Sequence, residues 1–196
     1  VQVARLFVVF TICWITSVSN AATITLSAVA DTCIRANSPA NGWGAYTDIW
    51  VGAAGKASNF QRRGLFKFDL SSIPAGSVIT AGTLQLTVID SHDQSVNYNI
   101  FRSLKDWTEG TGSSKSGSST TTGATWADAK KGTLAWATAG GGSGTDYNAA
   151  ASATTAISTV GTYSWTGTNL VNDLTTWYNN PTQNYGWFLI SGSETA

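Results

Sequence analysis

The sequence predicts an all-β protein with a single core of the sandwich type. In its ordered parts, apolar and polar residues alternate with a period of two, most clearly where Val96, Tyr98 and Ile100 alternate with Asn97 and Asn99. Such alternation puts one face of a strand on a core and the other in solvent. Only one segment carries a helical pattern, and 196 residues suit one domain.

Three further segments carry the pattern of half-buried strands. Ile24 and Leu26 alternate with threonine, and leucine and valine alternate with polar residues over 83–88. The alternation over 64–70 predicts another strand, which the turn residues of 71–76 end.

Residues 103–153 are expected to form a long loop region, because they are rich in glycine, serine and threonine. Trp107, Trp126 and Trp136 interrupt this composition. Tryptophan is not expected in a flexible linker, because its large apolar ring is stabilised by burial and would be left in water there. We therefore expect these three side chains to pin the loop onto the sandwich.

The single helical pattern lies at 169–179, where four apolar residues from Leu170 to Trp177 fall on one face. Proline at position 181 ends the pattern. A last strand is expected at 185–191.

The first 21 residues are typical of an export signal. A positive charge precedes an apolar run over 6–15, and the small residues Ser19 and Ala21 occupy positions −3 and −1 of a cleavage site. The apolar run is too short to span a bilayer. We therefore expect a signal peptide at 1–21 and a secreted protein with one domain at 22–196; the alternative is a buried N-terminal strand.

The charge pattern argues against two classes of partner. Charged residues make up 11% of the chain and balance to zero, and lysine and arginine are scattered after residue 21. Without a basic stripe or a basic helix, we expect no binding to nucleic acid and no non-specific adhesion to membranes.

Removal of residues 1–21 would leave Cys33 as the single cysteine, which excludes an intramolecular disulfide. Cys33 is expected to be a small strand residue. A catalytic pair with His92, the single histidine, is disfavoured because His92 lies in a polar stretch.

Several motifs match a known family in both residues and order. They are Ala30-Asp31-Thr32, Asn41-Gly42-Trp43-Gly44, Val51-Gly52, the stretch from Arg63 to Gly76, Asp106-Trp107-Thr108-Glu109-Gly110-Thr111-Gly112, Gly123-Ala124-Thr125-Trp126, Trp136, and Trp177 ahead of Asn184-Tyr185-Gly186. In these motifs the chain resembles the DNRLRE-type, or disaggregatase-related, domains over about residues 22 to 192. The stretch from Arg63 to Gly76 is the most specific part of the resemblance.

The resemblance implies both a fold and a class of function. Such domains are jelly-roll sandwiches of extracellular bacterial and archaeal proteins, often beside polysaccharide-degrading or adhesive domains, and some are classed as carbohydrate-binding modules. It therefore implies a jelly-roll β-sandwich that binds a ligand rather than catalyses a reaction.

The chain departs from the family pattern in two places. Cys33 stands where an aromatic residue is usual, and the last strand or two after Gly192 are missing. A jelly roll without its last strand has an unpaired edge. We expect either a truncated sequence or a strand supplied by another chain, which would make the protein self-associate.

Binding of sugars by a sandwich needs flat aromatic faces beside groups that hydrogen-bond hydroxyls. The candidates are Trp43 in a Gly/Asn loop, Trp50 and Tyr98 on predicted strands, and Trp107 at the start of the long loop. For each of the four, the alternative role is an anchor of the core or of the loop.

Acidic residues lead to two further predictions. The candidate oxygen ligands for a structural calcium ion are Asp31, Asp48, Asp69, Asp90 and Asp93, although the chain carries no calcium-loop motif. Arg63 and Asp69 share one face of the predicted strand, where ion pairs with neighbouring strands are expected. Together with Asp31 they are predicted to be structural residues.

An enzyme that hydrolyses or lyses polysaccharides needs two positioned carboxyl groups, or an acid with a base. Asp106 and Glu109 flank Trp107, but they lie in a Gly-Ser loop that cannot hold a general acid in tight geometry. We therefore expect a secreted carbohydrate-binding module for an extracellular polysaccharide. A structural or adhesive matrix subunit is the alternative, followed by a polysaccharide-degrading enzyme.

Overall fold

The computed structural model describes residues 22–53, 60–91, 94–119 and 122–194. The predicted export signal, His92 and Asp93 lie outside these ranges. Within them, no helix is long and apolar enough to cross a membrane.

The elements confirm most of the predicted strands and the helix. In chain order they are β1 (Ala28–Arg35), β2 (Asn41–Gly42), β3 (Gly52–Ala53), β4 (Gln61–Phe68), β5 (Thr83–Val88), β6 (Val96–Arg102), β7 (Ser118–Ser119), β8 (Asp128–Lys130), β9 (Leu134–Ala135), β10 (Ala153–Ile157), β11 (Gly161–Thr166), α1 (Thr168–Asn179), η1 (Pro181–Gln183) and β12 (Trp187–Ser191). The strand predicted at Ile24 and Leu26 is wrong. The pairing of β1 with β4 begins only at Ala28, opposite Phe68, so the residues before β1 have no neighbouring strand there.

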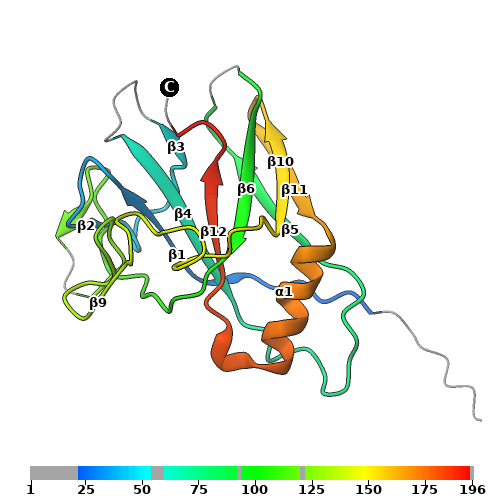
Figure 1. The fold of residues 1–196 in the computed structure, drawn as a ribbon. Helices are drawn as coiled ribbons and strands as arrows, with labels where there is room; N and C mark the ends of the chain where they lie inside the picture. The colour runs from blue at the N-terminus through cyan, green and yellow to red at the C-terminus, as the bar shows by residue number, and fades with distance from the viewer. Residues whose placement is uncertain (1–21, 54–59, 92–93, 120–121, 195–196) are drawn as a thin grey trace, which may run out of the picture.

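The main sheet has the strand order β1-β4-β12-β6-β10, with β3 paired to the start of β4, and all of these pairs are antiparallel. Figure 1 shows its strands side by side across the middle of the molecule. After β10 the chain leaves this sheet and forms β11, which pairs with β5 in a second, two-stranded sheet. In the part of the chain described, β5 has no partner on its other side. Assembly through an open edge stays a prediction.

Both faces of the main sheet are buried. On β12, Trp187 and Leu189 belong to one hydrophobic core, whereas Phe188 and Ile190 belong to another. On β4, Phe66 and Leu65 divide in the same way, as the alternation of side chains along a strand requires. The sheet is therefore the middle layer between two cores.

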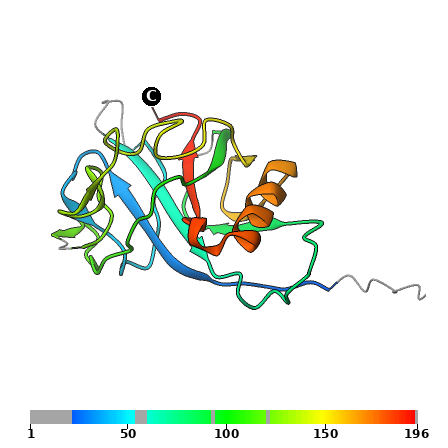
Figure 2. The same ribbon diagram turned by 60° about the horizontal axis from the view of Figure 1, so that its bottom comes forward.

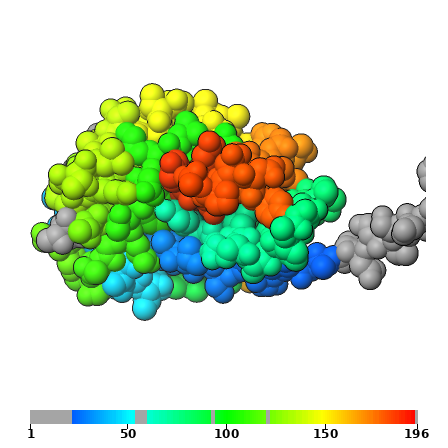
Figure 3. Space-filling view, turned by 90° about the horizontal axis from the view of Figure 1, so that it is seen from below, coloured from blue at the N-terminus to red at the C-terminus, as the bar shows by residue number. Residues whose placement is uncertain are grey.

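The second sheet and α1 cover the first core. Trp165 from β11, together with Leu170 and Trp177 from α1, packs against the main sheet. Figure 2 shows α1 and most of the long loop region on opposite sides of the molecule, and Figure 3 shows α1 and η1 beside the turn that follows β4.

The long loop region covers the second core, as the tryptophans predicted. Trp107 and Trp136 are buried there with Tyr147, and Trp126 packs against them partly buried. The rings of Trp136 and Phe188 meet with centroids 5.2 Å apart. The predicted all-β sandwich with a tryptophan-anchored loop region and one short helix is thus confirmed.

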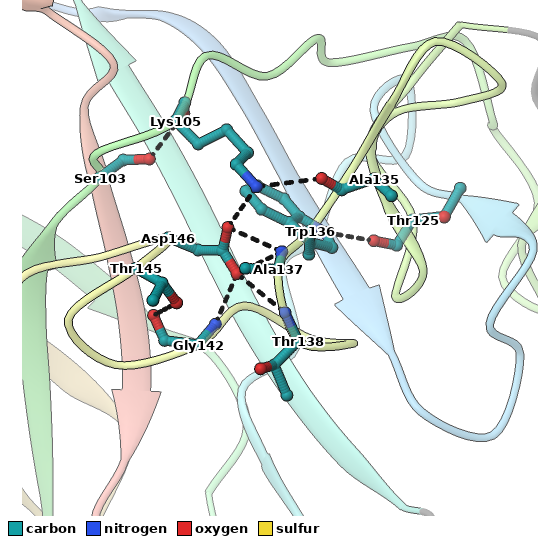
Figure 4. Close-up of polar contacts among 10 residues, drawn as sticks. All are labelled: Ser103, Lys105, Thr125, Ala135, Trp136, Ala137, Thr138, Gly142, Thr145 and Asp146. Carbon is teal, nitrogen blue, oxygen red and sulfur yellow. Dashed lines mark hydrogen bonds and ion pairs between the residues drawn. The ribbon is translucent and has the colours of Figure 1, made fainter.

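A buried carboxylate organises the loop region. Asp146, which is 0% exposed, accepts hydrogen bonds from the backbone N–H groups of Ala137, Thr138 and Gly142, and its Oδ1 lies 2.6 Å from Nζ of Lys105 (Figure 4). Burial alone would raise the pKa of this carboxyl group, but the N–H groups of Ala137, Gly142 and Thr138 and the ammonium of Lys105 together outweigh it and hold the pKa below its usual range. Asp146 is therefore ionised, and its carboxylate holds the segments around Ala137 and Gly142 together.

Arg63 links the residues that follow β12 to this loop. Its guanidinium forms an ion pair with Glu194 at 2.6 Å and donates to the carbonyl oxygens of Gly140 and Gly141. The predicted ion pair of Arg63 with a neighbouring strand is not the one observed, because Glu194 lies beyond the end of β12. For Asp69 the prediction is wrong: β4 ends at Phe68, and the exposed Asp69 carboxylate accepts hydrogen bonds from the backbone N–H and hydroxyl of Ser71.

Candidate cationic aromatic site

The structure places two of the four predicted sugar-binding aromatics in the interior. Trp43 is 1% exposed and Trp107 is 2% exposed. The indole N–H of Trp107 donates to the carbonyl of Tyr185 at 2.7 Å. Because neither ring has an exposed face on which a sugar could stack, both act as anchors in this structure.

The other two candidates, Trp50 and Tyr98, keep partial exposure, and among the described residues no ring contact joins them. Tyr98 lies on β6, two strands away from β4, and packs against the first core. Trp50 lies in the segment before β3, among basic side chains. Of the four candidates, Trp50 is therefore the one whose partly accessible ring lies among positively charged side chains.

A buried guanidinium forms the base of the Trp50 site. The Arg35 side chain stacks on two indoles, with Cζ 3.7 Å from the ring centroid of Trp50 and 4.1 Å from that of Trp43. Its Nη1 donates to the carbonyl of Lys115 at 3.2 Å. Cation–π contacts of this kind stabilise a cation most when it is desolvated, and Arg35 is only 4% exposed.

Two further cations surround the Trp50 ring. Cζ of Arg62 lies 5.2 Å and Nζ of the exposed Lys115 lies 5.9 Å from its centroid. Tyr46 packs against the same indole with centroids 5.6 Å apart. We call Arg35, Tyr46, Trp50, Arg62 and Lys115 the cationic aromatic site.

The positive charge of this site is not neutralised within the described residues. None of the ion pairs there involves Arg35, Arg62 or Lys115. Burial lowers the pKa of both arginines, and the charge of Arg62 adds to the lowering at Arg35. The lowered pKa values reflect mainly the removal of both guanidinium groups from water.

Unpartnered polar atoms mark the same place. In the described residues, five buried side-chain nitrogen and oxygen atoms lack a hydrogen-bond partner: Nε and Nη2 of Arg35, Nε of Arg62, Nε1 of Trp177 and Oδ1 of Asn184. Three of the five belong to the cationic aromatic site. Leaving a buried donor unsatisfied is costly, most of all on a charged group.

Sequence reasoning identified Trp50 but missed its basic neighbours. Arg35 and Arg62 are 27 positions apart, and only the antiparallel register of β1 and β4 sets them opposite each other. Arg62 and Arg63 point to opposite faces of β4, since Arg62 approaches Trp50 and Arg63 approaches Trp126. The Arg62-Arg63 doublet can be read from the sequence, but the position of Arg35 opposite Arg62 cannot.

The acidic candidates have other roles. Asp106 forms ion pairs with Lys67 and Lys130, and Glu109 accepts a hydrogen bond from the backbone N–H of Asp31. Burial raises the pKa of Asp31, and the neighbouring charge of Glu109 raises it further. Within the described ranges, no group of three or more His, Cys, Asp or Glu residues is placed to hold a metal ion. A structural calcium ion stays a prediction.

Comparison with known proteins assigns the family. No curated protein sequence matches the chain. Residues 22–139 match the model of carbohydrate-binding module family 96, and this range contains every residue of the cationic aromatic site. The match supports the predicted carbohydrate-binding character, while the narrower DNRLRE-type assignment stays a prediction. Because the match covers more than half of the sequence, the chain belongs to carbohydrate-binding module family 96.

Proposed function

We propose that the protein is a secreted, non-catalytic module that binds an acidic extracellular polysaccharide at the cationic aromatic site. One observation carries the proposal: three basic side chains surround a partly exposed indole, and none of them has a carboxylate partner in the described chain. Membership of a carbohydrate-binding family supplies the ligand class, and the charge supplies the preference within that class.

Each part of the site has a physical role in this proposal. The exposed part of Trp50 offers an apolar surface to the C–H groups of a sugar ring. Arg62 and Lys115 donate charge-assisted hydrogen bonds to a sugar carboxylate or sulfate. Buried Arg35 adds a positive charge that water screens poorly, so it attracts an anion without direct contact.

The carboxylates of the long loop support the non-catalytic part of the proposal. Burial alone would raise the pKa of Asp106, but Lys130 and Lys67 lower it overall. A carboxyl group held ionised between two ammonium groups is a poor general acid.

A double substitution tests the proposed site. Replacing both Arg62 and Lys115 with glutamine should raise the Kd for an acidic polysaccharide by at least about 100-fold, since each of the two charge-assisted hydrogen bonds contributes about 1.5–3 kcal/mol. Trp50→Ala should weaken binding as well. Affinity electrophoresis in gels containing the polysaccharide measures both effects.

Lys131→Gln is the matched control, because Lys131 pairs with Asp128 outside the site. It removes one positive charge, half of what the double variant loses, and should leave binding unchanged. Equal retardation of the double variant and the parent protein would contradict the proposed site.

A further inference from the structure

A cleft opens at the opposite end of β4 from the cationic aromatic site. Its volume is about 580 Å³, and its walls come from the turn after β4 and from the end of α1 with η1. Figure 3 shows these segments side by side on one face of the molecule. The volume falls within the range of about 300–1,000 Å³ that is usual for ligand sites.

The remaining two unpartnered atoms belong to side chains that line this cleft. They are Nε1 of Trp177, a donor, and Oδ1 of Asn184, an acceptor. All five unpartnered atoms of the described residues therefore belong either to the cationic aromatic site or to side chains that line this cleft.

Trp177 is an exception among the buried tryptophans. The indole N–H groups of Trp43, Trp107, Trp136, Trp165 and Trp187 all donate to protein oxygen atoms. Trp177 is 1% exposed and has no acceptor. A buried indole N–H normally finds a partner, so its orphan state needs an explanation.

Packing fixes both orphan groups in place. The rings of Trp177 and Trp187 meet with centroids 4.5 Å apart. The Asn184 amide nitrogen donates to the carbonyl of Phe68 at 2.7 Å, and this hydrogen bond fixes the orientation of the amide. A donor and an acceptor are thus held in place, and because each of the two atoms exposes less than 1 Å² of surface, a bound group reaches them only after small shifts of the side chains that line the cleft.

The chemistry of the cleft favours a neutral sugar. A hydroxyl group both donates and accepts, so sugar hydroxyls can satisfy the indole N–H and the amide oxygen together. Leu70, Ile73 and Pro181 offer apolar walls to the C–H groups of a sugar ring. The single charged lining residue is Asp69, whose carboxylate repels an acidic sugar.

We propose that this cleft is a second carbohydrate subsite, which binds a neutral sugar unit through Trp177 and Asn184. The proposal rests on the proposed carbohydrate-binding function, but it uses different residues and a different ligand charge. From Arg62 to Phe68, β4 spans roughly 20 Å at about 3.3 Å per residue. Because the two sites lie at opposite ends of this strand, one chain can bind two different glycan segments.

The indole N–H resonances give a direct test. A ¹H–¹⁵N spectrum of the protein resolves the tryptophan indoles, and Trp177→Phe assigns the Trp177 signal by its loss. Titration with neutral hexasaccharides of glucose, mannose, xylose and galactose should shift that signal downfield for at least one sugar, as expected when the indole gains an acceptor. An unchanged Trp177 signal throughout the panel would overturn the proposal.

A pair of substitutions separates this cleft from the cationic aromatic site. Ala75 is exposed and lines the cleft, so Ala75→Trp should fill the cleft and abolish the shift of Trp177. The control, Ala150→Trp, adds the same bulk at an exposed alanine outside the cleft and should preserve the shift. If both variants bind the neutral sugar equally well, the cleft is not the subsite.

Failure of the two proposals can be told apart. Binding of an acidic polysaccharide should shift the Trp50 indole and survive Ala75→Trp, whatever happens at Trp177. If the parent protein binds a neutral sugar but no acidic polysaccharide, the proposed function is contradicted, whereas the proposed subsite in the cleft is supported.

Discussion

Replacing Asp146 with alanine should lower the free energy of unfolding by about 3–5 kcal/mol, the usual effect of removing one partner of a buried ion pair. The substitution leaves the backbone N–H groups of Ala137, Thr138 and Gly142 without their carboxylate acceptor. It also removes the negative charge beside the Lys105 ammonium, which keeps its hydrogen bond to the carbonyl of Ala135. Since Trp136 lies next to this segment in the second core, its fluorescence reports the loss. Urea unfolding followed by tryptophan fluorescence measures the effect.

Asp128→Asn is the control for this prediction. Asp128 forms a longer ion pair with Lys131, at 3.7 Å, between partly exposed side chains. Its loss should change the free energy of unfolding by less than about 1 kcal/mol. Similar losses of stability for the two variants would contradict the conclusion that Asp146 organises the loop region.

The effect of Asp146 should depend on pH in a defined direction. Because its folded-state pKa is lowered, its contribution is complete above the unfolded pKa of about 3.9 and is lost as the pH falls through the folded value. The stability difference between the parent protein and Asp146→Asn should therefore be constant above about pH 5 and shrink in stronger acid. A difference that grows on acidification would contradict the ionised state of Asp146.

Gly186→Ala is expected to have an effect at least as large. Gly186 has φ +72°, and a Cβ at this position would overlap the carbonyl oxygen of Phe66 on the neighbouring β4. Backbone atoms of the main sheet cannot move aside without breaking its ladder. The variant should lose more than about 3 kcal/mol of stability, as strongly overpacked sites do, or fail to fold.

Gly132→Ala separates steric overlap from backbone strain. Gly132 has almost the same φ, +73°, but a Cβ there would have no heavy atom within 4 Å. It should cost only the strain of a left-handed alanine, about 1–2 kcal/mol. Comparable losses at the two glycines would show that close packing against β4 does not decide the effect.

The sequence predicts strands well where one face meets solvent. Polar residues alternate with apolar ones along β5 and β6 because these strands are half-buried. On β4, the alternation placed Leu65 opposite Phe66, but it could not show that Leu65 is also fully buried. Its cover is the long loop, whose packing depends on contacts between distant residues.

The loop region was predicted only in part, for a physical reason. The size and apolar character of Trp107 and Trp136 predict that both side chains are buried. Asp146 gives no such signal, since its role depends on three backbone N–H groups that converge only in the folded loop. The same limit applies to Arg35, whose two stacked indoles come from different segments.

The measurement that tests the central claim most directly is calorimetric titration of the protein with an acidic polysaccharide and with its carboxyl-reduced form, at low ionic strength. The two ligands differ only at the carboxyl groups, which reduction converts into neutral primary alcohols. The native polymer should bind at least about tenfold more tightly, a difference of about 1.4 kcal/mol, and the preference should vanish in the Arg62→Gln, Lys115→Gln double variant. Equal affinity of the parent protein for the two polymers would contradict the account.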